Sequence, residues 1–184
     1  MESKKKSIIA STEGSNLGTD VYKSLIDNSI SAIFLSRPTG EIIEVNNAAE
    51  KMFGYSKADF VKIGREGILD QKDIHLPILL AQRREAGKAN GEITGIKKNG
   101  ERFPIEFTSS IFNDHSGEEL ICTIMQDITG RKIVEQEMLM MLNNTEECFM
   151  LLDKDLLILN FNKQFKYLYK KYFHSSVEKG LEIF

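Results

Sequence analysis

The sequence has little of what several common protein classes require. Its 184 residues include only two cysteines, Cys122 and Cys148, too few for a disulfide framework or a thiolate zinc site, so we expect a reduced environment. The 24 basic residues nearly balance the 27 acidic ones, and the net charge of −3 offers no strong attraction for nucleic acid or an anionic membrane. The longest apolar runs have five residues, against the ~20 of a membrane-spanning helix. We therefore predict a cytoplasmic fragment without nucleic-acid or membrane partners.

The signatures of common enzymes are absent as well. No serine or cysteine nucleophile lies in a turn with the histidine and acidic partners that would activate it, and the glycines between residues 87 and 100 do not form a phosphate-binding loop. A kinase histidine box and an ATP-site motif are missing too. The three histidines, His75, His115 and His174, are isolated from other metal-ligand side chains. We predict neither catalytic nor metal-binding residues, and no enzyme activity of the fragment itself.

The first part of the chain predicts a tail, a short helix and a β-hairpin. Residues 1–18 are polar, include three consecutive lysines and are typical of a disordered tail. From Thr19 or Asp20, apolar residues recur at helical spacing, which predicts a short amphipathic helix. Two segments rich in branched apolar residues, 32–35 and 41–45, are separated by a turn with proline and glycine and predict a β-hairpin.

The middle of the chain predicts helices followed by three more strands. Asn46 can cap a short helix, a helical pattern covers residues 57–63, and Asp73 can cap a longer helix through Ala86. An Asn-Gly turn joins two alternating segments within residues 92–112 into a second hairpin. The nearly continuous apolar run at residues 120–125 predicts a last strand that is covered on both faces. This order predicts an α+β fold with a five-stranded antiparallel sheet and short helices on one face. The N-terminal helix, a linker helix or a partner protomer could cover the other face.

Residues 129–144 predict one helix that follows the sheet as a linker. Val134, Met138 and Met141 form an apolar stripe along it. The stripe can pack on its own domain or form a short coiled coil with another protomer. Both alternatives stay open, because fewer than three heptads cannot establish a coiled coil.

The end of the chain repeats the pattern of its beginning. Residues 25–53 align without a gap with residues 141–169, at an offset of 116 positions. The identical pairs are Asn28 and Asn144, Leu35 and Leu151, Ile42 and Ile158, and Asn46 and Asn162. The helix end, the hairpin and the asparagine-capped helix correspond as well. We therefore predict a second, incomplete copy that lacks the three strands needed to complete a core.

Several separated motifs occur in order along residues 20–130. They are Ala32-Ile33-Phe34-Leu35, Ile42 to Asn46, Ala48-Ala49-Glu50, Phe53-Gly54-Tyr55, Lys97 to Phe103, and Asp127-Ile128-Thr129-Gly130-Arg131-Lys132. Together they resemble a PAS domain of the S-box type. We accordingly divide the chain after the tail into a PAS domain at residues 19–129, a linker helix at 130–144 and an incomplete second PAS-like domain at 145–184.

The resemblance implies a sensory input or relay module of a bacterial signalling protein. Such a module binds a small ligand, dimerises, or does both, and passes its state through the linker helix to an output domain in the same chain. We expect a homodimer and the output of a two-component sensor histidine kinase. The alternatives are a ligand-independent dimerisation domain and the input domain of a diguanylate cyclase. The expected relay residues are Asp127, Thr129, Val134, Met138 and Met141.

The resemblance also bears on two cofactors. Blue-light-sensing relatives carry a flavin and a reactive cysteine before the long helix, but residues 55–73 contain no cysteine. Haem-binding relatives place an axial histidine four residues after an aspartate that matches Asp73, where this chain has Pro77, and His75 would point about 200° away. We therefore expect neither covalent flavin nor haem, and a non-covalent small molecule remains the candidate ligand.

The predicted ligand pocket lies between the sheet and the long helix. Strand alternation places eight side chains on one face of the sheet, and the resemblance puts Leu80 and Ala81 of the long helix opposite them. The eight are Phe34, Ser36, Ile105, Phe107, Ser109, Ile121, Thr123 and Met125. The set is apolar with a few hydroxyl groups and no fixed charge, which suits a neutral ligand held by shape. The alternative is that these side chains simply fill the core.

Overall fold

A computed structural model describes residues 21–181 of the chain. The predicted tail at residues 1–18 and the predicted start of the domain at Thr19 lie outside the described residues. The chain divides into two units, Met1–Thr129 and Gly130–Phe184, and each is described by itself. Within residues 21–181, no helix combines the length and the apolar character that a membrane crossing requires.

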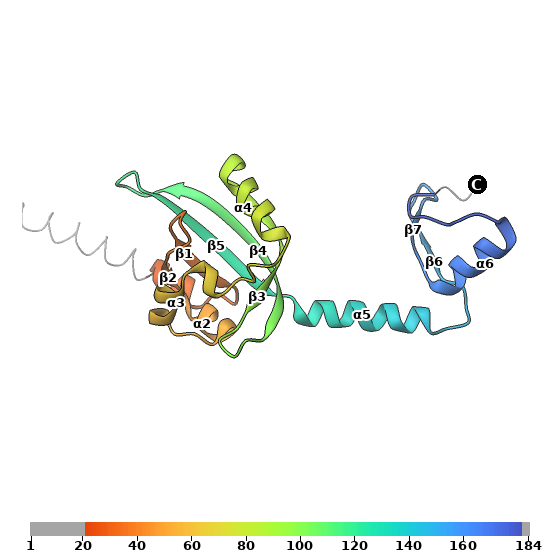
Figure 1. Ribbon diagram of the computed structural model, residues 1–184, viewed down its shortest axis with the longest axis horizontal. Coiled ribbons are helices and arrows are strands. Elements are labelled where there is room, and N and C mark those ends of the chain that lie inside the picture. The colour runs from red at the N-terminus through yellow and green to blue at the C-terminus, as the bar shows by residue number, and fades with distance from the viewer. Residues whose placement is uncertain (1–20, 182–184) are drawn as a thin grey trace, which may run out of the picture. The chain divides into compact units, whose positions relative to one another are not determined.

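The first unit is built on a five-stranded antiparallel sheet with the order β2-β1-β5-β4-β3 (Figure 1). The strands are β1 (Ala32–Ser36), β2 (Ile42–Val45), β3 (Lys88–Ile96), β4 (Arg102–Asn113) and β5 (Glu119–Asp127). The last strand in the sequence, β5, lies at the centre of the sheet, between β1 and β4. This arrangement confirms the predicted α+β fold.

Short helices between β2 and β3 pack on one face of this sheet. They are α2 (Asn47–Phe53), α3 (Lys57–Ile63), the 3-10 turn η1 (Arg65–Gly67) and α4 (His75–Ala86). The side chain of Asn46 caps α2, as predicted, and Gly54 ends that helix with a φ of 77°. Ser56 and Asp59 form a capping box at the start of α3. Local sequence therefore sets the ends of the two short helices.

The long helix α4 starts at His75, one residue later than a cap at Asp73 predicts, and the side chain of Asp73 bonds both to the start of the helix and to β3. Asp73 Oδ1 accepts the His75 N–H at 2.9 Å, and Oδ2 accepts the Thr94 N–H of β3 at 2.8 Å. Desolvation raises the pKa of Asp73, but the hydrogen bonds from His75 and Thr94 outweigh it and bring the pKa below its ordinary value. Asp73 thus fixes the start of α4 against the sheet.

The core of the first unit is centred on four phenylalanines. Phe34 of β1, Phe53 of α2, Phe60 of α3 and Phe103 of β4 are all buried. Their rings meet edge to face, with centroid distances between 5.4 and 6.0 Å. Each such pair contributes roughly 0.5–1.5 kcal/mol beyond the burial of its area. The cluster joins two short helices to the sheet.

The other face of the sheet is largely exposed among the described residues 21–129 of the first unit. Ile124 of β5 is 41% exposed and Phe112 of β4 is 42% exposed, so the described residues of the first unit do not supply the predicted cover of β5 on its second face, and cover by a partner protomer stays a prediction. One sheet with helices on one side has no second layer, and its outer positions carry branched and aromatic residues because these suit extended backbone. The helical residues 21–27 leave Tyr22 and Leu25 exposed as well.

The second unit contains one hairpin and its flanking helices. Its elements are α5 (Thr129–Asn143), which begins at the last residue of the first unit, β6 (Met150–Leu152), β7 (Ile158–Phe161) and α6 (Lys163–Phe173). None of the side chains of α5 is buried. The predicted stripe of Val134, Met138 and Met141 is exposed.

The hairpin of the second unit repeats the geometry of the first, 116 positions later. β1 pairs Phe34 with Val45 of β2, and β6 pairs Met150 with Phe161 of β7. Both hairpins have a register shift at the same place in the strand. In the turns, the backbone φ is 99° at Gly40 and 64° at the corresponding Leu156.

Two buried asparagines give the closest correspondence between the units. In each, Oδ1 accepts two backbone N–H groups and Nδ2 donates to two carbonyl oxygens. The partners of Asn46 are Ile26, Ser31, Ile33 and Ala49, and those of Asn162 are Leu142, Glu147, Phe149 and Phe165. Each partner of Asn162 follows its counterpart by 116 positions.

Candidate functional site

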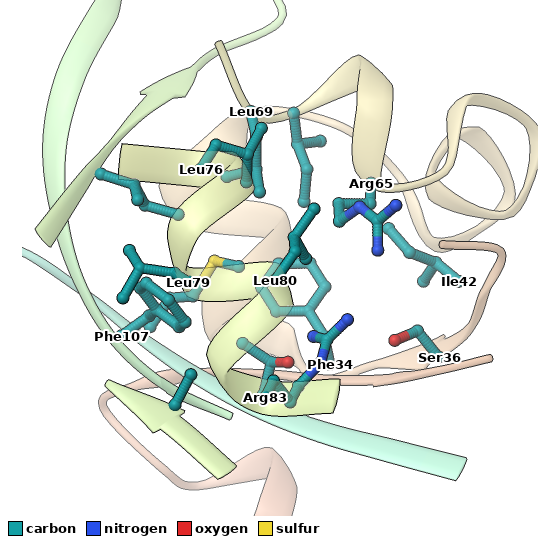
Figure 2. A pocket seen from close by; sticks show the side chains of 15 residues that line it. Phe34, Ser36, Ile42, Arg65, Leu69, Leu76, Leu79, Leu80, Arg83 and Phe107 are labelled. Carbon is teal, nitrogen blue, oxygen red and sulfur yellow. The ribbon is translucent and has the colours of Figure 1, made fainter. Parts of the chain in front are cut away.

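A cavity of about 40 Å³ lies between α4 and the helix-covered face of the sheet (Figure 2). A water molecule needs about 10–15 Å³ by this measure, so the cavity has room for roughly three waters. The lining side chains are Phe34, Ser36, Ile42, Arg65, Ile68, Leu69, Leu76, Leu79, Leu80, Arg83, Ala89, Ile93, Phe107, Thr123 and Met125.

Six of the ten side chains predicted from the sequence line this cavity. They are Phe34, Ser36, Leu80, Phe107, Thr123 and Met125. Phe34, Phe107 and Met125 are buried and point between the strands and α4. Five of the six lie at alternate positions of the strands, and the sixth, Leu80, lies on the long helix.

The other four predicted side chains lie elsewhere. Ile105 is fully buried in the phenylalanine core, and Ser109 is buried with its Oγ 2.9 Å from Oγ1 of the cavity-lining Thr123. Ile121 lines a neighbouring cavity, and Ala81 is exposed on α4. A helix turns about 100° per residue, so Leu76, Leu79, Leu80 and Arg83 share the inner face and Ala81 does not.

Two arginines make the site charged, contrary to the prediction of an uncharged lining. Arg65 comes from the turn η1, and Arg83 stands on α4 four residues after Leu79 and seven after Leu76. The residues of the turn follow no helical or strand period, so no sequence pattern indicated that Arg65 lines the cavity. The spacing from Leu76 and Leu79 did carry a signal for Arg83, because residues four and seven apart lie on one face of a helix.

Both guanidinium groups are half-buried, and neither forms a salt bridge in the described part of the chain. Among the described residues, no carboxylate lies within salt-bridge distance of Arg65 or Arg83. Burial lowers the pKa of each, although the charge of Glu66 raises that of Arg65. The charges of Arg65 and Arg84 lower the pKa of Arg83 further, whereas Glu119 raises it. The site therefore holds two positive charges at a partly dry position.

The position of each guanidinium is set by its neighbours. Arg83 Nη1 donates to Ser109 Oγ at 3.0 Å, and that oxygen is also bonded to Thr123. The Arg65 guanidinium lies against Gly40 in the β1–β2 turn, where an added Cβ would be 3.0 Å from Arg65 Cζ. Figure 2 shows both groups on the side of the cavity near Ser36 and Ile42.

A second cavity adjoins the first beside the arginines. Its volume is about 130 Å³, and it shares Arg65, Leu80 and Arg83 with the inner cavity. The rest of its lining is Pro38, Arg84, Ile111, Glu119 and Ile121. The arginines therefore lie where an apolar inner space meets a more polar outer space.

The predicted relay residues lie at the end of β5 and along α5. Asp127 Oδ1 accepts the Thr129 N–H at 2.8 Å, and the Ile128 N–H between them donates to the Pro104 carbonyl of β4 at 3.1 Å. Thr129 Oγ1 is buried and has no hydrogen-bond partner among residues 21–181. The start of α5 is therefore bonded to the last strand of the sheet.

The remaining candidate residues lie outside the cavity lining. His75 is exposed at the start of α4, with Nδ1 3.1 Å from Asp73 Oδ1. Cys122 is half-buried on β5, and burial raises the pKa of its thiol, which reduces the share of reactive thiolate. Within residues 21–181, no group of three or more potential ligand side chains could hold a metal ion.

Comparisons with known proteins agree with this fold. A family model described as a PAS domain matches residues 30–130, and no curated protein matches the chain. The crystal structure of a PAS domain from a two-component sensor histidine kinase is 18% identical, with a TM-score of 0.54 over 61% of this chain and 98% of that chain. A PAS domain of a protein from Colwellia psychrerythraea is 23% identical, with a TM-score of 0.56 and coverages of 61% and 98%. The PAS domain of nitrogen regulation protein NR(II) from Vibrio parahaemolyticus is 19% identical, with a TM-score of 0.50 and coverages of 58% and 96%.

Proposed function

The chain belongs to the PAS domain family, and from this we propose that it is the sensory input module of a two-component sensor histidine kinase. In this proposal the module binds a small ligand in the cavity beside α4 and passes its state through α5 to an output domain in the same chain. The likeness to a PAS domain from a sensor histidine kinase supports this output, and a diguanylate cyclase is the alternative. We propose a cytoplasmic location for the module.

The observation that carries the proposal is that β5 runs from the wall of the cavity to the start of α5. Thr123 and Met125 of this strand line the cavity, and the strand ends at Asp127, which is bonded to the first residue of α5. A ligand that displaces Met125 therefore acts on the strand from which α5 starts. This continuity supports a relay from the cavity to the helix.

The test of ligand binding is whether a small molecule stabilises the folded chain. A ligand that binds only the folded state at 100 times its dissociation constant stabilises it by about 2.7 kcal/mol. The full chain is screened against a metabolite panel by thermal unfolding, and native mass spectrometry counts the bound molecules. A panel in which no molecule raises the unfolding temperature would contradict the proposal.

Two matched variants locate the binding site. Ala89→Leu replaces a methyl group in the wall of the cavity by a larger side chain that fills part of the cavity. It should abolish the stabilisation by a ligand. Ala81→Leu makes the same change on the exposed side of α4 and should leave it intact. Overpacking at Ala89 costs about 1–3 kcal/mol, so circular dichroism first verifies that this variant is folded. Binding that survives Ala89→Leu would place the ligand elsewhere.

A ligand-independent dimerisation domain is the second candidate function. The exposed apolar residues on the outer face of the sheet, among them Ile43, Phe112 and Ile124, favour it. We expect a homodimer by size-exclusion chromatography with light scattering. Ile124→Glu should convert it to a monomer, and Ile78→Glu, at an exposed position of α4, should not. A wild-type chain that stays monomeric at every concentration tested rules out this candidate.

The relay can be tested on the apolar stripe of α5. Replacing Met138 and Met141 by glutamate should alter dimerisation or the activity of the output domain in the complete signalling protein, because the stripe would then no longer pack on an apolar partner. Unchanged oligomeric state and unchanged output activity would show that the stripe has no part in the relay.

We also propose that residues 145–184 begin a second PAS-like domain. The repeated hairpin register and the repeated bonds of Asn162 support this. Met150 is 37% exposed, whereas its counterpart Phe34 is 2% exposed, because the first unit covers Phe34 with helices and with β5. Hydrogen exchange should therefore be slow in the strands of the first unit and faster in β6 and β7. Equal protection of both would show that the second segment is complete by itself.

A further inference from the structure

The two arginines narrow the class of ligand beyond what the fold indicates. We propose that the site takes a small anion with a short apolar tail, whose carboxylate or phosphate group is held between Arg65 and Arg83. This inference rests on the proposed function, because it concerns the same cavity, and it replaces the neutral ligand expected from the sequence.

The charges at the site are the first argument. Arg65 and Arg83 are half-buried, so each cation has lost part of its hydration, and neither has a carboxylate within salt-bridge distance in the described part of the chain. Removing a cation from water is costly unless an anion or hydrogen-bond acceptors replace the water. Arg83 has one such acceptor in Ser109, and no side-chain hydrogen bond of Arg65 is found among the described residues. An anion that bridges the two groups would supply the missing acceptors.

The shape of the site is the second argument. The inner cavity is lined by apolar side chains such as Leu76, Phe107 and Met125, and its volume of about 40 Å³ admits a tail of about three or four carbon atoms. The outer cavity shares both arginines. A short amphiphile can therefore place its tail inside and its charged group at the boundary, where a guanidinium can pair with a carboxylate or phosphate through two parallel hydrogen bonds.

Glu119 limits the strength of this site. Its carboxylate lines the outer cavity and interacts with Arg83 across a distance longer than a salt bridge. A negative charge there repels an anionic ligand. Removing it by Glu119→Gln should strengthen binding of an anion and leave binding of a neutral molecule unchanged.

The experiment is calorimetric titration of the full chain with butyrate, butyl phosphate and the neutral butyramide. We expect an anion to bind with a dissociation constant on the order of 1 mM, since so small a ligand makes few contacts, and butyramide to bind roughly tenfold more weakly or not at all. The ratio of butyrate to butyl phosphate affinity identifies the preferred anionic group. Arg65→Gln and Arg83→Gln should each weaken anion binding roughly tenfold. Arg102→Gln removes the same charge outside both cavities and should have little effect.

The outcomes separate this inference from the function on which it rests. One outcome is that butyramide and butyrate bind equally, with binding lost in Ala89→Leu but unaffected by the arginine substitutions. That result overturns the proposal of an anionic ligand and is consistent with a module that binds a small ligand in this cavity. If none of the three probes binds, the proposal of an anionic ligand is overturned as well. The screen of the metabolite panel then decides whether the chain binds any small ligand. Anion binding that Arg102→Gln weakens as much as Arg83→Gln would reflect the net charge of the chain, and would also overturn the proposal.

Discussion

Asn46 offers the sharpest test of how the first unit is held together. Its amide side chain is 1% exposed and makes four hydrogen bonds. Oδ1 accepts the N–H groups of Ile33 at 2.9 Å and Ala49 at 3.1 Å, and Nδ2 donates to the carbonyls of Ile26 at 2.9 Å and Ser31 at 3.0 Å. One side chain thereby joins the end of the first helix, β1 and α2.

The number of bonds gives the expected cost of Asn46→Ala. At about 1 kcal/mol for each of the lost bonds, the sum is about 4 kcal/mol. Water can reach part of the backbone around Ser31, which is only half-buried, so we expect a loss of about 3 kcal/mol. An N-cap alone contributes about 1 kcal/mol. The difference between these values tests whether Asn46 does more than cap α2.

Asn46→Asp separates the two roles more directly. Aspartate caps a helix as well as asparagine does, but it cannot donate to Ile26 and Ser31, and it sets a carboxylate against their carbonyl oxygens. We expect Asn46→Asp to cost at least about 2 kcal/mol. The neighbouring Asn47→Asp, at an exposed position in the first turn of α2, is the control and should be neutral or slightly stabilising.

Urea unfolding followed by two-dimensional NMR provides the assay, because signals from β4 and β5 report the first unit separately from the second. With a slope of about 2 kcal/mol per molar, a loss of 3 kcal/mol lowers the midpoint by about 1.5 M. A neutral Asn46→Asp would refute the reasoning, since the cap alone would then explain the residue.

Three further predictions concern other parts of the chain. Leu156→Gly should stabilise the β6–β7 hairpin by about 0.5–1 kcal/mol, because Leu156 adopts a φ of 64° that glycine tolerates better; faster hydrogen exchange in β7 of the variant would contradict this. Gly95→Ala should cost about 1–3 kcal/mol in urea unfolding, since the added Cβ would overlap Ile105 and lie 2.8 Å from the Phe103 ring; an unchanged midpoint would show that the core can adjust. Bonds from Lys98 and Ser56 lower the pKa of Asp59 to about 2 from an ordinary 3.8, so its stabilisation is full above pH 3.8 and is lost as the pH falls towards 2; an NMR titration midpoint near 4 would exclude these bonds.

The fold could be predicted from the sequence where side-chain pattern decides structure. The alternation of Phe103, Ile105 and Phe107 identified β4, and the Asn-Gly turn joined it to β3. The start of β3 at Lys88 instead of residue 92 was missed. Gly87 and Gly91 interrupt the pattern there, although Gly91 pairs with Phe107 in the register of the sheet.

The site could be predicted only in part, for a similar reason. Residues on strands follow a period of two, which placed Phe34, Thr123 and Met125 correctly along the wall of the cavity. Arg65 lies in an irregular turn that tertiary packing brings to the cavity, and no local pattern encodes that approach. The contribution of Arg65 to the charge of the site therefore follows only from the three-dimensional structure.

The glycine of the β1–β2 turn has a consequence for divergence between the two units. Gly40 has no side chain, and this leaves the space in which the Arg65 guanidinium lies. Leu156 occupies the equivalent turn position, also at a positive φ, and carries the side chain that Gly40 lacks. A cavity built on β6 and β7 could not hold an arginine in the same place. If residues 145–184 begin the second PAS-like domain proposed above, its cavity would therefore lack this arginine, although the two backbones begin in the same way.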